Sequence, residues 1–334
     1  MEAIFLEPYF RTKLWGGRKL ETLFNYQIPD GKVGEAWIIS GYRDDASHVI
    51  NGKFKGMSLR DLYQKHPELF ANPEEQEFPL LVKYLDANDN LSVQVHPDDE
   101  YAAIHENDSG KTESWYVLQA DPGSYLIYGH HAKSRQELAD MIHEGRWDDL
   151  LRKVPVKKGD FFYVPAGTIH ALTKGIVVIE TQQSSDVTYR LYDYDRVDKA
   201  TGQKRELHTQ KSIDVTTVPH KNPQLDIRKE KCGDATITML LNKPVSPHFY
   251  LAKIDLDGEV KFTMNWPYQL FSVISGSGKL CLPDKEYDLK LGDNFILPAG
   301  SYDFTFSGKI SMITSAPIKA VSYTHLTLPT ILLV

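Results

Sequence analysis

The fold of this chain is decided by one stretch, Gly159-Asp160-Phe161-Phe162-Tyr163-Val164-Pro165-Ala166-Gly167-Thr168-Ile169-His170. Its aromatic and aliphatic residues predict a short buried strand, and the Pro-Ala-Gly that follows predicts a tight turn. His170 stands where the next strand is expected to begin. A second stretch, Gly292-Asp293-Asn294-Phe295-Ile296-Leu297-Pro298-Ala299-Gly300-Ser301-Tyr302-Asp303, repeats the glycines and the proline at an offset of 133 residues. Asp303 replaces the histidine there, so only the first copy keeps this imidazole, a potential metal ligand.

The repeat extends towards the N-terminus. Trp115-Tyr116-Val117-Leu118 aligns with Phe271-Ser272-Val273-Ile274 at an offset of 156, so the first copy holds 23 extra residues. Ser134 and Glu137 have capping-box spacing and open an amphipathic stretch that predicts one or two helices. We therefore expect a helical insertion at about residues 131–153, within the first β unit.

The two copies also differ at the residues that could bind a metal. In the register of the repeat, Glu113 corresponds to Gln269 and His170 corresponds to Asp303. Two candidate ligands are therefore lost together in the second copy. A repeat that loses its ligands in one copy predicts a single site, located in the other copy.

The length of 334 residues exceeds what one compact core usually organises, so two domains are expected. We assign residues 1–200 to an N-terminal catalytic domain and residues 227–318 to a C-terminal domain without a metal site. Residues 201–226 contain turn signals and polar connectors, which favours a linker. The apolar segment 319–334 fits neither domain. It is interpreted as a non-native tail, the alternative being a final strand or packing tail.

Composition and charge exclude several classes of function. Hydrophobic content of 41% and charged content of 25% are ordinary for a globular protein, and the net charge of −7 offers no basic surface for nucleic acid. No run of about 18 apolar residues predicts a membrane span. Cys232 and Cys281 are the only cysteines, and the N-terminus shows no signal peptide. We therefore expect a cytoplasmic protein without a disulfide framework.

The segment Leu91–Pro97 alternates as a strand does, which places Ser92, Gln94 and His96 on one face. Polar side chains two residues apart on one strand can point at one ion. Gln94 and His96 are therefore candidate ligands. Because an amide oxygen is a poor donor to zinc, the alternative is that Gln94 lies beside the ligands without binding the metal itself.

These residues resemble the cupin superfamily, whose members are β-sandwich barrels of jelly-roll type. Its second motif, G-x5-P-x-G-x2-H, is met at every named position from Gly159 to His170. Its first motif normally has H-x-H followed by Glu, and here Gln94-Val95-His96 precedes Glu113. The resemblance implies a mainly β fold, with two jelly-roll cupin barrels in tandem and a small helical insertion in the first.

The combined motifs are more specific than either cupin motif alone. The type I mannose-6-phosphate isomerases, in particular the short bacterial members, resemble this chain in four places: Gln-x-His-Pro-Asp at 94–98, Lys-x-Glu at 111–113, Pro-Ala-Gly-x-x-His at 165–170 and Gln-Gln-x-Ser-Asp-x-Thr-x-Arg at 182–190. The resemblance covers roughly residues 1–317. It implies that the second barrel carries no ligand set.

The resemblance further implies a metal-dependent aldose–ketose isomerase that interconverts mannose 6-phosphate and fructose 6-phosphate, so the expected partner is a small sugar phosphate. One zinc ion per chain would be bound by His96, Glu113, His170 and Gln94. Other divalent ions accept such nitrogen and oxygen ligands, so the identity of the metal rests on the resemblance. For His170 taken alone, the alternative is a histidine at the barrel mouth that hydrogen bonds the backbone.

The implied reaction moves a proton between C2 and C1 through a cis-enediol, so a base is required. Candidates near the ligands are Lys111, Glu180, Glu35 and His96. Arg190 matches the family's essential arginine and could hold the phosphate or the enediolate charge. Its alternative is a salt bridge with the aspartates near it in sequence. We take Arg190, Lys111 and Glu180 as the catalytic residues.

Substrate binding is assigned to Lys83, Ser92 and Glu35. Lys83 is the one charged residue of the apolar run Phe78–Leu85, where a lysine is costly unless it is paired or faces a cavity. A strand-end lysine that reaches solvent is its alternative. For Lys111, the alternative is a solvated loop lysine.

Two other functions compete with the isomerase. A metal-dependent cupin of another class, such as a dioxygenase or decarboxylase, usually carries more histidines, and Gln94 counts against it. A non-enzymatic sugar-binding bicupin has no need of a complete catalytic set. The intact set of His96, Glu113, His170 and Arg190 counts against that reading.

Overall fold

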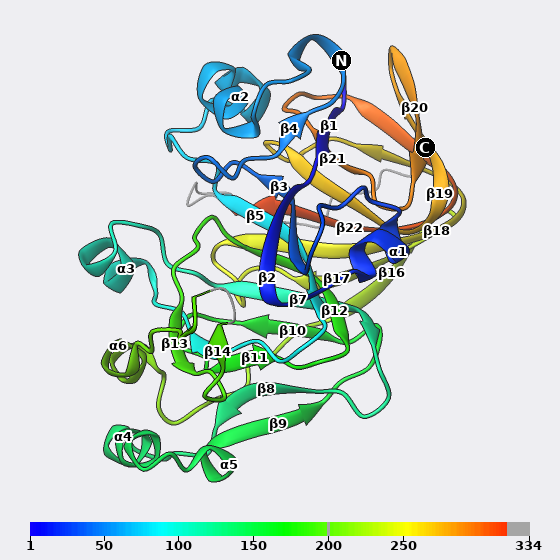
Figure 1. Ribbon diagram of the computed structural model, residues 1–334. Helices are drawn as coiled ribbons and strands as arrows, with labels where there is room; N and C mark the ends of the chain where they lie inside the picture. Colours follow the sequence, from blue (N-terminus) through cyan, green and yellow to red (C-terminus); the bar gives the residue numbers. More distant parts are fainter. Residues whose placement is uncertain (199–200, 319–334) are drawn as a thin grey trace.

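The computed structural model describes residues 1–198 and 201–318, and β-strands dominate it (Figure 1). The segment 319–334, interpreted above as a non-native tail, lies outside the described residues. The described helices are short: α1 (Lys19–Phe24), α2 (Leu59–Lys65), α3 (Asp99–His105), α4 (Arg135–His143), α5 (Trp147–Leu150), α6 (Thr209–Val215) and the 3-10 turns η1 (Gly52–Phe54) and η2 (Pro67–Phe70).

The first β unit consists of two sheets that face each other. One sheet has the strand order β10 (Phe161–Val164), β7 (Glu113–Ala120), β12 (Ile176–Gln183), β5 (Leu80–Ala87), β3 (Val33–Ser40), β2 (Tyr9–Gly17). The other has the order β13 (Tyr189–Tyr192), β6 (Val93–Val95), β11 (His170–Leu172), β8 (Tyr125–His130), β9 (Leu151–Pro155). Leu172 of β11 packs in one core with Leu85 and Trp115 of the first sheet, so the two sheets form a sandwich.

The second β unit is built from one long sheet. Its strands follow the order β16 (Arg228–Cys232), β17 (Ala235–Leu241), β18 (Phe249–Thr263), β22 (Asp303–Pro317), β19 (Gln269–Leu282), β21 (Asn294–Leu297), β1 (Ile4–Glu7), β4 (His48–Val49), with β20 (Lys285–Lys290) paired to β19. A separate hairpin joins β14 (Val197–Asp198) to β15 (Gln203–Lys204). In Figure 1 the yellow-to-red strands of this unit lie above the green strands of the first.

The first strand of the chain lies in the sheet of the second unit. Ile4 of β1 pairs with Ile296 of β21, and the blue β1 is seen beside β21 in Figure 1. The N-terminal residues thus extend a sheet whose other strands, β4 excepted, come from the second unit. The domain boundaries expected from the sequence stay a prediction, and β1 reaches across them.

The repeat expected from the sequence is present in the strand register. Glu113 of β7 pairs with Val164 of β10, and Gln269 of β19 pairs with Leu297 of β21. Gln269 corresponds to Glu113 by the offset of 156 residues, and Leu297 corresponds to Val164 by the offset of 133. The aligned copies therefore form the same hairpin in both units.

The long strands β18, β22 and β19 share a row of glycines. Gly308 of β22 pairs with Gly258 of β18 on one side and with Gly278 of β19 on the other. A Cβ atom on Gly308 would lie 2.6 Å from the Cα of Gly278, and the φ angle of Gly308 is +118°. Only glycine allows this close approach at that backbone angle.

The helical insertion is shorter than expected. Ser134 accepts a hydrogen bond from the backbone N–H of Glu137, which confirms the predicted cap of α4. After α5, however, Leu151–Pro155 forms strand β9 and pairs with β8, so residues 151–153 are not helical. This strand pairs with the edge of the five-stranded sheet, and that pairing stabilises it more than the weak local helix preference would stabilise a helix.

Two shorter helices follow the sequence closely. The Ser58 hydroxyl caps α2 by accepting from Asp61 N–H, and Asp98 caps α3 by accepting from Tyr101 N–H. The segment after Pro97 is therefore a short helix, as predicted. Across the described residues, no helix combines the length and the apolar character needed to cross a membrane.

Candidate active site

Arg190, Gln94 and His170 form a row across three adjacent strands. Arg190 of β13 and His170 of β11 both pair directly with Gln94 of β6. Directly paired residues point to the same face of a sheet. The Gln94 amide lies 3.3 Å from His170 Nε2, so the row brings three predicted residues together.

A second row crosses the facing sheet. Trp37, Lys83, Glu180 and Trp115 are consecutive partners on β3, β5, β12 and β7. Trp115 Nε1 donates to Glu180 Oε2 at 2.8 Å, and Lys83 Nζ lies 3.5 Å from Glu180 Oε1. Glu113 stands two residues before Trp115 on β7, so it points to the same side of the sheet.

Glu113 is the centre of a buried cluster between the two sheets. Its Oε1 lies 3.2 Å from His170 Nε2, and its Oε2 lies 3.3 Å from His96 Nε2. Lys111 Nζ lies 3.2 Å from Glu113 Oε2 and 3.1 Å from His96 Nε2. Within residues 1–198 and 201–318, His96, Glu113 and His170 are the one group of three potential metal ligands whose atoms lie within 4.8 Å of one another.

Both histidines of the cluster are held in one tautomer. His96 Nδ1 lies 2.8 Å from the carbonyl oxygen of Val187, and His170 Nδ1 lies 2.8 Å from that of Thr168. Because a carbonyl can only accept, each Nδ1 carries the proton and donates it. The Nε2 lone pairs are therefore left facing Glu113, which is the arrangement a metal-binding imidazole needs.

The protonation states of the cluster follow from burial and neighbouring charge. Burial lowers the pKa of His170 and, with the charge of Lys111, lowers the pKa of His96 to about 3. Burial alone would raise the pKa of Glu113, but the charge of Lys111 holds it well below its usual range. Burial would lower the pKa of Lys111, and Glu113 raises it instead. The result is two neutral imidazoles beside a carboxylate, the forms that bind metals.

A cavity of about 280 Å³ adjoins the cluster. Gln94 and Lys111 line it and also contact cluster residues, so the cluster lies at its inner end. Five lysines or arginines line the cavity against three aspartates or glutamates. This excess of cations suits an anionic ligand.

The two buried glutamates of the cavity differ in basicity. Glu35 accepts from Trp37 Nε1 at 2.7 Å and lies 3.0 Å from Lys13 Nζ. Burial alone would raise the pKa of Glu35, but Lys13 and a second lysine hold it below its usual value. Burial, and then the charge of Glu113, raise the pKa of Glu180. Glu180 is therefore the more basic carboxylate of the two.

Arg190 reaches the cavity from β13. Its Nη1 donates to the carbonyl oxygen of Glu206 at 2.8 Å, while its buried Nε has no hydrogen-bond partner among the described residues. The nearby Asp193 is bound by Arg205 and Arg196 instead. Burial and the charge of Arg205 lower the pKa of Arg190. A guanidinium with an unused donor among other cations is suited to an incoming anion.

The structure brings together every residue to which the sequence assigned a site role. Seven of them line the cavity: Glu35, Lys83, Ser92, Gln94, Lys111, Glu180 and Arg190. The other three form the buried cluster: His96, Glu113 and His170. Their individual roles stay a prediction.

Sequence reasoning missed several cavity residues, among them Lys13, Asp186, Thr188 and Arg205. Asp186 and Thr188 stand four and two residues before Arg190, and this spacing of two was an available signal. Lys13 and Arg205 carried no such local signal. Arg205 also lies in the segment expected to be a linker, 201–226, which here contributes a side chain to the site.

Comparison with known proteins identifies the family. Residues 4–141 match the family described as phosphomannose isomerase type I, catalytic domain, and residues 240–317 match mannose-6-phosphate isomerase, cupin domain. The mannose-6-phosphate isomerase of Streptococcus mutans is 48% identical over 314 residues, which are 94% of this chain and 98% of that protein. This chain belongs to the type I mannose-6-phosphate isomerase family.

Other members of this family agree with the assignment. The mannose-6-phosphate isomerase ManA of Bacillus subtilis is 45% identical over 315 residues, covering 94% of this chain and 98% of that protein. The crystal structure of a mannose 6-phosphate isomerase from Bacillus subtilis superposes with a TM-score of 0.91 at 44% identity, covering 95% of this chain and 100% of that one. The family resemblance and the tandem cupin fold predicted from the sequence are both confirmed.

The cluster fits the metal ion that this family resemblance implies. Among the described residues, neither oxygen of Glu113 has a hydrogen bond, and Lys111 is an ion-pair partner of Oε2 alone. The buried Oε1 faces the lone pair of His170 Nε2, an expensive arrangement unless a metal ion lies between them. The imidazole lone pairs beside the Glu113 oxygens complete a mixed nitrogen and oxygen donor set. The role of Gln94 stays a prediction: its amide lies at the edge of the cluster beside His170.

The second unit differs at the equivalent positions. Asp303 is exposed and pairs with Lys261 at 2.6 Å, and Gln269 donates to the hydroxyl of Thr314 at 2.8 Å. These two residues are therefore occupied by contacts of their own. In the described residues, the potential metal ligands converge in the first unit alone.

Proposed function

We propose that this chain interconverts mannose 6-phosphate and fructose 6-phosphate, with one zinc ion per chain bound by His96, Glu113 and His170. The observation that carries the proposal is the buried His–Glu–His cluster at the inner end of a cation-rich cavity. Its occurrence in a chain of the type I mannose-6-phosphate isomerase family supports this substrate. The cytoplasmic location expected from the cysteine content stays a prediction.

The cations of the cavity bind the phosphate and position the sugar. Arg190 offers a buried Nε–H that has no partner in the part of the chain that the structure describes, and Arg205 lies against the same cavity. A planar guanidinium holds phosphate oxygens in two hydrogen bonds, which fixes orientation as well as position. Binding the phosphate at Arg190 and Arg205 directs the sugar carbons towards the cluster of His96, Glu113 and His170.

The base is Glu180. Glu35 is a weaker base because its pKa is lowered, and the Nε2 of His96 is directed at the metal site. Lys111 keeps its proton because Glu113 raises its pKa. The raised pKa of Glu180 makes it the carboxylate best suited to take a proton from C2 and return it at C1.

Lys111 stabilises the charge that develops when the proton leaves. Its Nζ lies within 3.2 Å of Glu113 at the inner end of the cavity, where it can donate to an enediolate oxygen. When bound, zinc supplies Lewis-acid stabilisation of the same oxygens. The surrounding sandwich core, with Trp115 1% exposed, limits the access of water to the reacting carbons.

A coupled isomerase assay tests the proposal. The purified chain is assayed with mannose 6-phosphate before and after treatment with a chelator, and again after zinc is restored. We expect turnover to disappear with the metal and to return with zinc. Full turnover by metal-free protein would refute the metal-dependent mechanism, and no turnover by the zinc-loaded protein would refute the substrate.

A further inference from the structure

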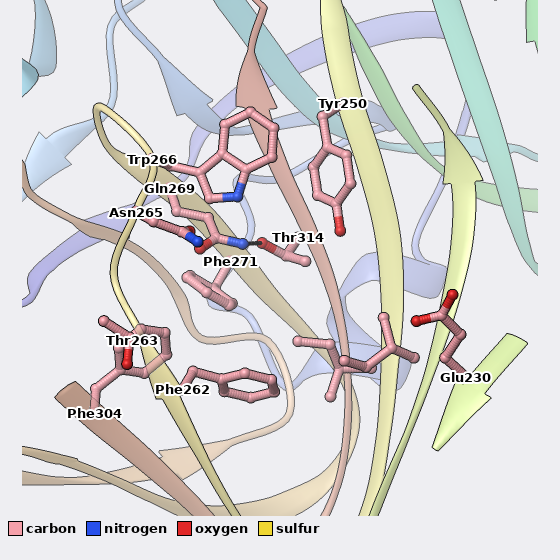
Figure 2. A pocket seen from close by; sticks show the side chains of 12 residues that line it. Glu230, Tyr250, Phe262, Thr263, Asn265, Trp266, Gln269, Phe271, Phe304 and Thr314 are labelled. Carbon is pink, nitrogen blue, oxygen red and sulfur yellow. Dashed lines mark hydrogen bonds between the residues drawn. The ribbon is translucent and has the colours of Figure 1, made fainter. Parts of the chain in front are cut away.

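The second unit contains a cavity of its own, lined by residues of β16, β17, β18, β19, β22 and the turn between β18 and β19. We call it the second cavity. Figure 2 shows Trp266, Tyr250 and Phe271 around the hydrogen bond from Gln269 to Thr314. Its volume is about 50 Å³. That is room for about four water molecules, so it takes the edge of one small ring.

The second cavity is the counterpart of the active-site cavity in strand register. Glu180 pairs with Trp115 in the first unit, as Thr314 pairs with Phe271 in the second. Four positions related by such pairing line both cavities: Gln94 and Thr263, Leu85 and Ile254, Trp115 and Phe271, Glu180 and Thr314. The repeated fold therefore builds the same hollow twice.

The charged groups of the active site are absent from this counterpart. By strand pairing, Thr314 occupies the position in the second unit that corresponds to Glu180, and Ala252 occupies the position that corresponds to Lys83. The second cavity has no lysine or arginine among its described lining residues, and its one charged residue is the exposed Glu230. A phosphorylated sugar would meet no cation there and one carboxylate, so the second cavity disfavours anions.

The surface that remains is aromatic with a few polar groups. The rings of Tyr250 and Trp266 lie 4.8 Å apart, and Phe271 lines the same cavity. The Gln269 amide is fixed by its nitrogen on Thr314, which leaves the amide oxygen able to accept from a ligand. Flat apolar walls with convergent hydrogen-bonding groups suit an uncharged ring that has an apolar face and a polar edge.

We propose that the second cavity is a binding site for an unphosphorylated hexopyranose. One edge of the sugar ring enters the second cavity, where its C–H groups lie against the rings of Trp266 and Tyr250 and Gln269 binds a hydroxyl. The choice of a hexose ring rests on the proposed function, because the second cavity is the register counterpart of a cavity that takes a hexose phosphate. The absence of a phosphate on the ligand rests on the lining residues alone.

The test uses the full chain and methyl α-mannopyranoside, a sugar locked in its ring form and without phosphate. Ligand-observed saturation-transfer NMR measures binding, first alone and then with saturating mannose 6-phosphate. We expect saturable binding that the phosphorylated sugar does not displace. Displacement would place the glycoside in the active site and overturn the inference, as would the absence of binding.

Two variants locate the site. We expect Trp266→Ala to weaken glycoside binding about tenfold, and Gln269→Leu to weaken it as well, with isomerase activity retained as evidence of folding. Trp147→Ala is the matched control, because that ring stacks on Tyr192 in the first unit. Unchanged binding in both cavity variants overturns the inference. So does binding of benzyl alcohol, an apolar probe, without binding of the glycoside.

The inference and the proposed function fail separately. A chain that isomerises mannose 6-phosphate without binding the glycoside keeps the proposed function and loses the second site. A chain that binds the glycoside in the Trp266-dependent manner without isomerising mannose 6-phosphate keeps the second site and loses the proposed function.

Discussion

Replacing Lys83 with methionine tests the charge arrangement of the active site. Lys83 and Glu180 are 2% and 3% exposed, and their charged atoms lie 3.5 Å apart. Methionine fills a similar volume without the charge. Glu180 then keeps the hydrogen bond from Trp115 but loses the cation on its other oxygen.

The size of the effect follows from burial. Removing one partner of a buried ion pair costs about 3–5 kcal/mol of unfolding free energy, whereas an exposed pair contributes less than about 1 kcal/mol. We therefore expect Lys83→Met to lose a few kcal/mol in urea unfolding at pH 8. The matched control is Lys309→Met, since Lys309 also forms an ion pair with a residue directly opposite it on the neighbouring strand, Asp257, at 2.8 Å, but with side chains that are 83% and 74% exposed. The control should lose far less.

The same variant has a definite pH dependence. Burial raises the pKa of Glu180 and Lys83 opposes this rise, so the variant raises that pKa further. Between the unfolded and folded pKa values, the native state then binds a proton that the unfolded chain does not. Stability falls as pH rises through that window. We expect the deficit of Lys83→Met to be smaller at pH 5 than at pH 8. A deficit equal to that of Lys309→Met, or one independent of pH, would refute the reasoning.

Four further predictions follow from the site and the fold. His170→Ala should lower the amount of bound metal and lower kcat/KM by more than about 100-fold. Asp303→Ala should leave the metal content unchanged. If metal analysis shows that Asp303→Ala loses one equivalent, the second unit holds a metal site. Glu180→Gln should lower kcat by about 100- to 10,000-fold, and a kcat within a few-fold of the parent would exclude it as the base. Gly308→Ala should cost about 1–3 kcal/mol in urea unfolding, since its Cβ would meet Gly278 at 2.6 Å; an unchanged midpoint contradicts this. Burial would raise the pKa of Asp193, but two arginines lower it, so the stability that Asp193 contributes is present above its unfolded pKa and is lost as pH falls through its folded pKa. The free energy of unfolding between pH 2 and 5 should therefore depend less on pH in Asp193→Asn. The same dependence on pH in both proteins would contradict this.

Much of the active site could be predicted because its residues stand in short motifs. His170 follows a Pro-Ala-Gly turn, and Gly167 adopts a φ of +82° that this turn requires. Gln94 and His96 stand two positions apart in a segment that alternates as a strand does, so alternation alone predicted that they share one face. Such patterns act over a few residues of backbone, and a single sequence contains them in full.

The second cavity shows the opposite case. The repeat was visible in the sequence, and so was the loss of two ligands at Gln269 and Asp303. That a hollow persists there depends on how β18, β19 and β22 align, because Thr314 reaches Phe271 only through their pairing. The sequence offset between the two copies does not show which side chains line a cavity.

The sequence by itself therefore determined the tandem cupin units, the family and the chemistry of the ligand set. Tertiary structure decided that β1 extends the sheet of the second unit, that Lys83 is paired with Glu180, and that Arg205 reaches the active-site cavity. Lys83 and Glu180 are far apart in the chain and meet only because β5 and β12 pair in one register. Local periodicity fixes which face a residue occupies, whereas strand register fixes what it faces, and register is a property of the whole folded sheet.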